Sequence, residues 1–351
     1  MSQPVPRLVP RRWDPLTIGV DIGGTKVLAG VVDSSGHVVA RERRRTQGSS
    51  PEAVENTIVE LVRLFSRTYD VAAVGIGAAG FVDATRSTVM FSPHLAWRDE
   101  PLREAVMARV RVPVVVDNDA NTAALAESRF GAGIGHRTVL CVTLGTGIGG
   151  ALVIDSRVFR GAHGMAGEFG HIQVVPDGHR CQCGNRGCWE QYASGNALVR
   201  DARELIISGS PVAHRLRELV GGDPDNLTGP LVTEAAREGD PVSVELLAEV
   251  GTWLGVGLAG MAAAFDPSCL IVGGGVSEAG DLLLGPARTA FARTLTGRGY
   301  RPEPPILGAA LGPDAGFIGA ADMARSAARR SRRSSRRQRG TLRRRLLRPD
   351  V

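Results

Sequence analysis

The sequence predicts an α/β protein built from two similar lobes, and two observations carry this prediction. A buried strand, a glycine-rich turn and a second strand follow one another at residues 17–33 and again at residues 138–155. A shift of 122 residues places Asp21 on Thr143 and keeps the glycines in register, so the two segments form a weak internal repeat. Apolar strand-like runs also alternate with segments of helical periodicity, which is typical of α/β folds. The 351-residue chain is long enough for two domains.

The other elements follow from local patterns. Apolar residues recur at helical spacing in 51–67, whereas 71–76 is a short apolar run that ends at glycine, as a buried strand does. An alanine-rich stretch follows the apolar strand 112–116 and ends before Gly131, which predicts a helix that stops at Phe130. The same criteria predict further helices at 101–110, 190–207, 232–265 and 315–328, and a strand at 270–272.

These elements divide the chain into segments. In order they are a flexible N-terminus (1–16), an N-terminal lobe (17–117), a C-terminal lobe (118–312) with a cysteine-rich knuckle (171–188), a C-terminal helix (313–328) and a tail (329–351). The tail consists mainly of Arg, Ser and Gln with few apolar residues, so we expect it to be disordered.

The composition indicates a cytoplasmic protein. Hydrophobic residues make up 43% of the chain, and only five cysteines are present, which does not suggest a disulfide framework. The first 16 residues lack the apolar core of a secretory signal. The longest apolar run, Val250–Phe265, is too short to span a bilayer, so we expect a buried helix and no membrane partner.

Positive charge is concentrated at the C-terminal end. From Arg325 onward the net charge is +11, while the whole chain carries +6, so the remainder is mildly acidic. The arginines could bind polyanions, but no aromatic side chain lies among them to stack on bases. We therefore expect no specific nucleic-acid function.

The glycine turns are candidate phosphate sites. The segment Gly145–Gly150 matches G-x-G-x-x-G, but a strand follows it where a dinucleotide site needs a helix. The segment Asp21–Lys26 likewise lacks the P-loop spacing. Both therefore read as β-hairpins, whose backbone N–H groups can still surround phosphate oxygens. Either turn alone is more often an ordinary tight turn. Asp21 could hold Mg²⁺ through water.

Three carboxylates are candidates for sugar chemistry. Asp119 begins a predicted helix, whose dipole favours the ionised form that a general base needs. The alternative is that Asp117, Asn118 or Asp119 merely caps that helix. Glu168 and Glu190 could accept hydrogen bonds from sugar hydroxyls, or could be solvated surface carboxylates.

Glu168 and Glu190 bracket a pattern of one histidine and three cysteines. The spacing is H-x9-C-x-C-x4-C, with glycines and polar turn formers between the thiols. One imidazole and three thiolates form a complete tetrahedral set for structural Zn²⁺. A disulfide or chance clustering are the alternatives. The ligands would be His171, Cys181, Cys183 and Cys188.

Taken together, these motifs resemble the ROK family of repressors and sugar kinases, and most of all its bacterial glucokinases. The matching pieces are DIGGTK at 21–26, VDNDAN at 116–121, LGTGIGG at 144–150, GEFGH at 167–171, CQCGNRGCWE at 181–190 and IVGGG at 271–275. The resemblance implies an actin-like ATPase (ribonuclease H-like) fold, with two lobes around a cleft and a C-terminal helix returning to the first lobe. It also implies ATP-dependent phosphorylation of a hexose 6-hydroxyl and a homodimer or homotetramer.

The resemblance also implies roles for individual residues. Asp119 would be the catalytic base. Asn118, Glu168, His171 and Glu190 would bind the sugar together with Asp119. The four knuckle residues would bind Zn²⁺. From the glycine turns, we place phosphates at Gly23, Gly24, Thr25, Lys26, Gly145, Thr146 and Gly147, and adenosine at Gly273, Gly274 and Gly275.

We therefore predict a glucokinase that uses ATP and Mg²⁺. Other hexose acceptors (N-acetylmannosamine, fructose, mannose or allose) stay open because His94 stands where relatives commonly carry Asn, and polyphosphate stays open as donor. A sugar-sensing regulator of the same family is disfavoured, since only 16 residues precede the first strand, too few for a helix-turn-helix module.

Overall fold

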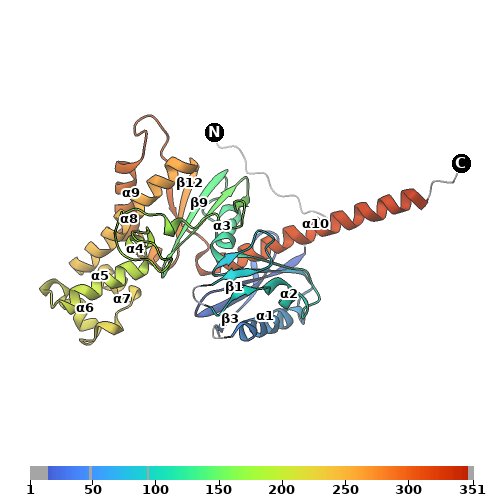
Figure 1. Ribbon diagram of the computed structural model, residues 1–351, viewed down its shortest axis with the longest axis horizontal. Coiled ribbons are helices and arrows are strands. Elements are labelled where there is room, and N and C mark those ends of the chain that lie inside the picture. Colours follow the sequence, from blue (N-terminus) through green and yellow to red (C-terminus); the bar gives the residue numbers. More distant parts are fainter. Residues whose placement is uncertain (1–14, 47–49, 93–94, 347–351) are drawn as a thin grey trace. The chain divides into compact units, whose positions relative to one another are not determined.

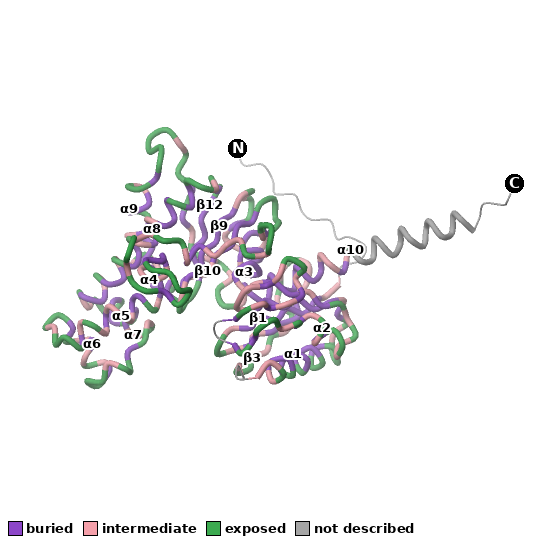
Figure 2. The backbone as a smooth tube through the Cα atoms, viewed as in Figure 1, coloured by how far each residue is buried: buried purple, intermediate pink, exposed green. Residues whose placement is uncertain are grey.

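A computed structural model describes residues 15–46, 50–92 and 95–346, with side chains through residue 330. The chain divides into two compact units: unit 1 comprises Met1–Ala123 and Gly316–Val351, and unit 2 comprises Ala124–Ala315. Each has its own sheet and hydrophobic core (Figures 1 and 2). His94, the residue that leaves hexose preference open, lies outside the described residues.

Unit 1 is built on a five-stranded sheet of order β3-β2-β1-β4-β8. The first three strands are antiparallel neighbours, whereas β4 and β8 run parallel to β1. Its elements are β1 (Leu16–Ile22), β2 (Lys26–Val32), β3 (Val38–Arg45), α1 (Pro51–Ser66), β4 (Val71–Ala78), β5 (Phe81–Val82), β6 (Val89–Phe91), β7 (Arg98–Glu100), α2 (Leu102–Met107), β8 (Val114–Asn118) and the start of α3 (Asp119–Phe130). Strands β5, β6 and β7 form a small separate sheet.

Unit 2 repeats the same sheet order, β11-β10-β9-β12-β13, with the same directions. The predicted internal repeat is therefore confirmed as a repeated topology. Its strands are β9 (Thr138–Leu144), β10 (Ile148–Ile154), β11 (Arg157–Phe159), β12 (Cys269–Gly273) and β13 (Ile306–Gly308). Its helices are α4 (Glu190–Ala193), α5 (Gly195–Ile207), α6 (His214–Leu219), α7 (Gly229–Arg237), α8 (Pro241–Phe265) and α9 (Asp281–Thr294). Short 3-10 helices are η1 (Phe169–His171), η2 (Pro211–Ala213), η3 (Pro224–Asn226), η4 (Gly275–Ala279) and η5 (Gly312–Asp314).

Two predicted helices of unit 2 are each divided. The helix expected over 190–207 breaks at Ser194, whose side chain instead accepts a hydrogen bond from Ala197 N–H at 3.2 Å and caps α5. The helix expected over 232–265 breaks between α7 and α8, where Gly239 has a φ of 92° and Pro241 starts the next helix. The predicted helix 101–110 is shortened to α2.

Helix α8 is the longest helix of unit 2, with 25 residues. By length and composition alone it could cross a membrane, and 61% of its most apolar window is buried. The expectation that this segment is too short to span a bilayer rested on the apolar run from Val250 alone, whereas the helix starts at Pro241. Leu254 and Leu258 are fully buried within the core of unit 2, so α8 packs as a core helix does.

Helix α10 (Ala315–Leu346) packs against the sheet of unit 1 with its first turns. A Cβ at Gly19 in β1 would lie 1.7 Å from the carbonyl oxygen of Phe317, so only glycine permits this approach. The sequence predicted that the helix would end at residue 328, but α10 continues to Leu346. Arg, Ala, Gln and Leu have favourable helix propensities, and the first glycine within α10 after Gly319 is Gly340.

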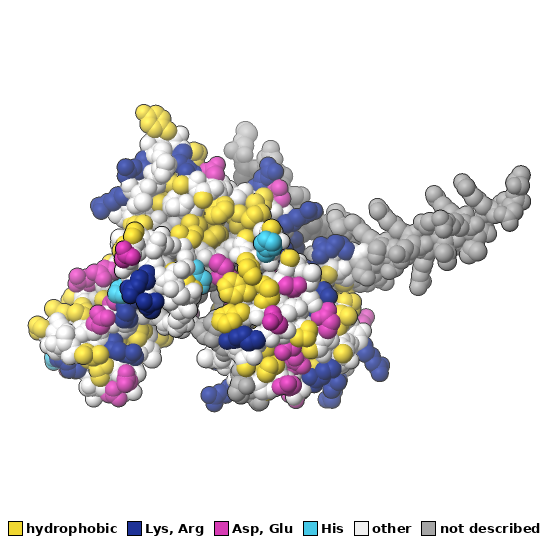
Figure 3. All heavy atoms as spheres, in the orientation of Figure 1, with side chains coloured by type: hydrophobic (Ala, Val, Ile, Leu, Met, Phe, Trp, Pro, Cys, Tyr) yellow, Lys and Arg dark blue, Asp and Glu magenta, His cyan; other side chains and the backbone are white. Residues whose placement is uncertain are grey.

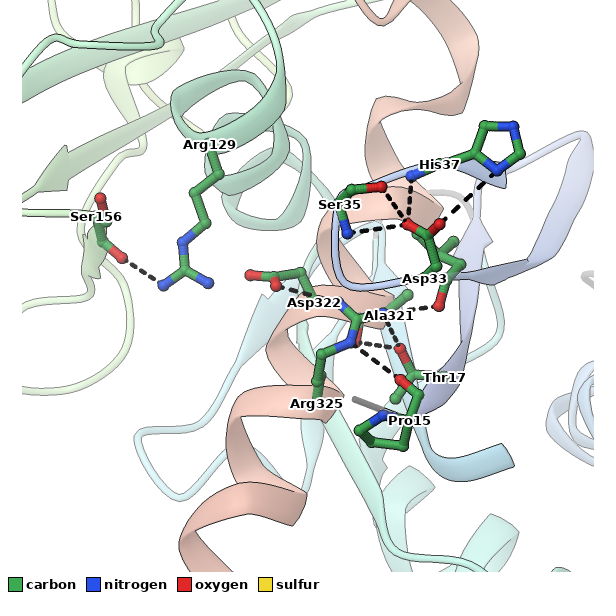
Figure 4. A network of polar contacts seen from close by, with 11 residues as sticks. Pro15, Thr17, Asp33, Ser35, His37, Arg129, Ser156, Ala321, Asp322 and Arg325 are labelled. Carbon is green, nitrogen blue, oxygen red and sulfur yellow. Dashed lines mark hydrogen bonds and ion pairs between the residues drawn. The ribbon is translucent and has the colours of Figure 1, made fainter. Parts of the chain in front are cut away.

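Arg325 fixes α10 to the strands beneath it (Figure 4). Its side chain is 1% exposed and donates to Thr17 Oγ1 at 2.8 Å, to the Val32 carbonyl at 2.7 Å and to Asp322 at 3.2 Å. A buried guanidinium is tolerated only when its donors are satisfied in this way. Arg325, counted with the basic segment on sequence alone, therefore belongs to the core of unit 1. In the described part of the surface, acidic and basic side chains are interspersed on the face that Figure 3 shows.

Candidate functional site

The first glycine turn joins β1 and β2 in an antiparallel hairpin, as predicted. Gly23 N–H donates to the Lys26 carbonyl at 3.0 Å and closes the turn. Thr46, which follows β3, donates its hydroxyl to the Gly23 carbonyl at 2.8 Å. The hairpin is therefore braced from the neighbouring strand and holds Gly24 and Thr25 exposed at its tip.

Asp21 lies in β1 of the same hairpin, opposite Gly77 of β4. Burial and, to a smaller extent, the negative charge of Asp119 raise the pKa of its carboxyl, Lys26 lowers it, and the net result is a pKa of about 7. A carboxyl that resists ionisation beside a second carboxylate is a location where a cation would be stabilised. The Mg²⁺ role of Asp21 stays a prediction.

The junction between β8 and α3 presents Asn118 and Asp119. Asp119 begins α3, as predicted. The Asn118 amide donates to the Gly80 carbonyl at 3.1 Å, and its Oδ1 accepts the Asn121 N–H at 3.1 Å. The side chain of Asn118 therefore caps the N-terminus of α3. Asp119 Oδ1 accepts a local hydrogen bond from Ala120 N–H at 2.9 Å.

The second glycine turn joins β9 and β10 in the corresponding hairpin of unit 2. Gly145 N–H donates to the Gly147 carbonyl at 3.0 Å. The tip also accepts two bonds from the start of α5, because Gly195 N–H reaches the Gly145 carbonyl at 2.8 Å and Asn196 N–H reaches the Thr146 carbonyl at 3.3 Å. The hairpin and the N-terminus of α5 therefore form one rigid edge.

A cavity of about 430 Å³ within unit 2 borders this edge. Of the predicted nucleotide residues, Gly145, Thr146 and Gly275 line it, whereas Gly147, Gly273 and Gly274 do not. Gly273 ends β12 and Gly274 packs its backbone on Leu144. The cavity is lined mainly by apolar atoms, which suits a nucleoside better than a bare phosphate chain.

Sequence reasoning missed much of this lining, which comes from α5, α7 and η4. The additional side chains are Asn196, Leu198, Val199, Pro230, Thr233, Glu234, Arg237, Val276 and Glu278. Arg237 pairs with Glu234 at 3.2 Å and donates to the Glu278 carbonyl at 2.7 Å, which joins α7 to η4. The sequence contains no motif for these residues. Its one usable signal was the four-residue spacing of Thr233 and Arg237, which places both side chains on the same face of α7.

The structure brings His171, Cys181, Cys183 and Cys188 together. One candidate ligand atom from each lies within 4.8 Å of the others. The Cys183 and Cys188 sulfurs are 3.6 Å apart, as are Cys181 Sγ and His171 Nδ1. Tetrahedral bonds of about 2.3 Å to zinc place ligands roughly 3.8 Å apart, while a disulfide needs about 2.05 Å. The geometry therefore fits a metal. In the structure Cys181, Cys183 and Cys188 are free thiols, so no disulfide joins them.

The knuckle has little regular structure of its own and depends on specific contacts. A Cβ at Gly187 would lie 1.6 Å from the Val175 carbonyl oxygen, and φ is 70° there, so the tight loop requires glycine. Trp189 is 1% exposed and donates its indole N–H to the Trp253 carbonyl on α8 at 2.8 Å. This anchor joins the knuckle to the core of unit 2.

Glu190 lies between the knuckle and the second hairpin. Its Oε1 is 3.1 Å from Cys181 Sγ and 3.6 Å from His171 Nδ1, and its Oε2 accepts the Ile148 N–H at 3.4 Å. Burial raises the pKa of the Cys181 thiol, and the hydrogen bond to Glu190 adds to this, so the thiolate requires a cation. Glu168 precedes η1, whose last residue is His171.

The repeated five-stranded sheets and their two glycine hairpins define an actin-like ATPase fold. Comparison with known proteins narrows this class. The chain belongs to the ROK family, whose sequence profile matches residues 17–327.

Two bacterial glucokinases are similar to this chain over nearly their full length. A glucokinase of Streptomyces coelicolor is 51% identical over 310 residues, which cover 88% of this chain and 98% of that protein. A glucokinase of Halalkalibacterium halodurans is 35% identical and covers 88% of this chain and 93% of its own. The solved structure of a ROK family glucokinase from Streptomyces griseus, in complex with glucose and AMPPNP, matches with a TM-score of 0.82. It is 52% identical, and the match covers 89% of this chain and 99% of that one.

Proposed function

We propose that this chain is an ATP-dependent glucokinase, a hexokinase-type phosphotransferase that converts glucose and ATP to glucose 6-phosphate and ADP. The observation that carries the proposal is its close similarity, over most of its length, to a structure that holds glucose and an ATP analogue. The family motifs of the sequence occur here on the two hairpins, the β8–α3 junction and the knuckle.

Asp119 is the proposed general base. It accepts the proton of the glucose 6-hydroxyl as that oxygen forms its bond to the γ-phosphorus and the bond from phosphorus to the ADP oxygen breaks. General base catalysis typically contributes ~10²–10⁴ in rate. The start of α3 favours its ionised form through the helix dipole.

The remaining sugar contacts are assigned to Asn118, Glu168, His171 and Glu190. Carboxylates accept from neighbouring hydroxyls, and an imidazole whose other nitrogen is bound to metal donates to one. Glu190 is supported by its contact to the knuckle, which fixes its carboxylate. The support for Glu168 is its place directly before η1.

ATP is assigned to the two hairpins and the unit 2 cavity. The turns at Gly23–Thr25 and Gly145–Gly147 supply backbone N–H groups for phosphates, with Lys26 as a nearby cation. The apolar cavity beside Thr146 supports a nucleoside donor over polyphosphate. Mg²⁺, bound near Asp21, would neutralise charge on the transferring phosphoryl group.

Zn²⁺ is assigned to the knuckle as a structural ion. Four ligands complete its shell, so it leaves no open position for chemistry. Its contribution is to hold His171 and Glu190. A cytoplasmic location, a homodimer or homotetramer, and polyanion binding by the basic segment stay predictions.

A coupled ADP-release assay over a hexose panel tests this function. We expect ATP to support turnover with glucose above N-acetylmannosamine, fructose, mannose and allose, and polyphosphate to support little. Asp119→Ala should lower kcat about 10²–10⁴-fold while its melting temperature stays near that of the wild type. Asp70→Ala, at an exposed aspartate of unit 1, is the control. Wild-type turnover in Asp119→Ala would remove this residue from the mechanism.

A further inference from the structure

A buried ion pair lies directly behind the proposed catalytic base. Asp117 is 2% exposed and precedes Asn118 at the end of β8. Its Oδ2 lies 3.8 Å from Nη1 of Arg86, which comes from the turn between β5 and β6. Neither residue has a role in the function proposed above, yet an almost fully buried carboxylate is costly unless it is paired.

The turn that carries Arg86 is held in one conformation. Arg86 has a backbone φ of 59°, a conformation that residues other than glycine rarely adopt. The Asp83 carboxylate accepts hydrogen bonds from Ser87 N–H and Thr88 N–H, both at 2.8 Å, and from Thr85. Burial would raise the pKa of Asp83, but these bonds outweigh it and lower the pKa to about 2. Unfavourable backbone conformations persist where surrounding contacts fix them, often at functional sites.

On its other side, Asp117 organises the β8–α3 junction. Its Oδ1 accepts the Asn118 N–H at 3.0 Å and the Asn121 side-chain amide at 3.0 Å. Asn121 in turn donates its backbone N–H to Asn118 Oδ1 at 3.1 Å. The Asn121 side-chain oxygen is buried without a partner, so its amide is oriented by Asp117 alone among the described contacts.

We propose that Asp117 and Arg86 are positioning residues for phosphoryl transfer: the ion pair fixes the first turn of α3, and so aims Asn118 and Asp119 at the acceptor hydroxyl. The inference rests on the proposed function, because it takes Asp119 as the base. Arg86 also neutralises a carboxylate that would otherwise add to the negative charge of Asp21 and Asp119. An ion pair that served stability alone would have no effect on turnover in the folded enzyme.

Unit 1 contains a matched control for this pair. Glu55 lies on α1 and Arg109 follows α2. Their Oε2 and Nη1 atoms are also 3.8 Å apart, and the carboxylate is again the more buried partner. The experiment measures kcat, KM for both substrates and melting temperature for Asp117→Asn, Arg86→Met, Arg86→Lys and the double variant Asp117→Asn with Arg86→Met. The control variants are Glu55→Gln and Arg109→Met.

We expect Asp117→Asn and Arg86→Met to lower kcat about 10- to 100-fold, the range that misplacement of a reacting group produces, while KM for ATP changes less than about threefold. Arg86→Lys should restore most of kcat, and the double variant should be no worse than Asp117→Asn, because the two residues act as one unit. The control variants should keep kcat near the wild type.

Two results would overturn the inference: unchanged kcat in folded Asp117→Asn, or an equal loss of kcat in the Glu55 and Arg109 variants. If Asp117→Asn does not fold, Arg86→Met and Arg86→Lys replace it in the test. Unchanged kcat in folded Arg86→Met, or an equal loss of kcat in Arg86→Lys, would then overturn the inference. A wild-type protein that phosphorylates no hexose would instead refute the proposed function, so the two failures are distinguishable.

Discussion

Units 1 and 2 share one sheet order but hold their candidate site residues by different means. In unit 1, Asp21 lies within a strand, and Asn118 and Asp119 lie at a strand–helix junction braced by the Asp117–Arg86 pair. In unit 2, Glu168 and His171 belong to a loop region with one short 3-10 helix and two isolated bridges, and Glu190 begins the four-residue helix α4 that follows this region. Regular hydrogen bonding therefore positions the first set, whereas the second depends on a cross-link between side chains.

The strongest test of this difference is removal of the proposed cross-link. We expect about one zinc per purified chain, and Cys183→Ser or a strong chelator should release it. Structural zinc contributes ~10–16 kcal/mol in small peptides, so the knuckle should lose its structure and glucose turnover should be lost. Hydrogen exchange should rise over 171–190 and stay unchanged in β1, β4 and β8.

Gln182→Ala provides the control in the same loop, since it alters no ligand. A chain that binds no metal, or a Cys183→Ser variant with wild-type exchange and turnover, would contradict the cross-link.

A smaller effect is expected in unit 1 from Arg325→Met. The substitution removes four hydrogen bonds from a buried site and leaves Asp322, which is 6% exposed, without this partner. Breaking a buried pair in this way costs about 3–5 kcal/mol, measured here as the free energy of unfolding in urea. The exposed Arg67→Met should change it by less than about 0.5 kcal/mol. Equal effects of the two substitutions would show that Arg325 contributes no more than a surface residue.

The last expected effect is a change in the pH dependence of stability at Asp21. Its pKa is about 7 in the folded protein against an ordinary value of 3.8, so the folded state retains a proton that the unfolded state loses. The resulting stabilisation is complete below about pH 4 and is lost as the pH rises to about 7. In Asp21→Asn the side chain does not ionise, so this loss of stability with rising pH should be absent. We therefore expect the stability of the wild type, relative to Asp21→Asn, to fall between about pH 4 and about pH 7 without added Mg²⁺. Parallel profiles would contradict it.

Much of the site could be predicted from the sequence because its signals are local. The hairpins follow from glycine turns between apolar runs, Asp119 from its place between a strand and an alanine-rich helix, and the knuckle from ligand spacing. The break before Pro241 also had a local signal, Gly239 and the proline, which the apolar periodicity of the segment outweighed.

Other features depend on contacts between residues far apart in the chain. Arg325 can be buried because Thr17 and Val32, about 300 residues away in the chain, accept hydrogen bonds from its guanidinium group. The cavity side chains of α7 carry no motif, and Arg86 lies in a turn whose sequence gives no reason to expect a buried partner. Only the fold reveals such pairings.

The way the chain enters and leaves unit 2 affects the order of synthesis. Unit 2 is one continuous stretch, Ala124–Ala315, whereas unit 1 is completed only by residues from Gly316 onward. The face of β1 at Gly19 thus stays without its helix until the residues from Gly316 onward leave the ribosome. Since domains fold as units during translation, the second unit can complete its core on the ribosome before the first one does.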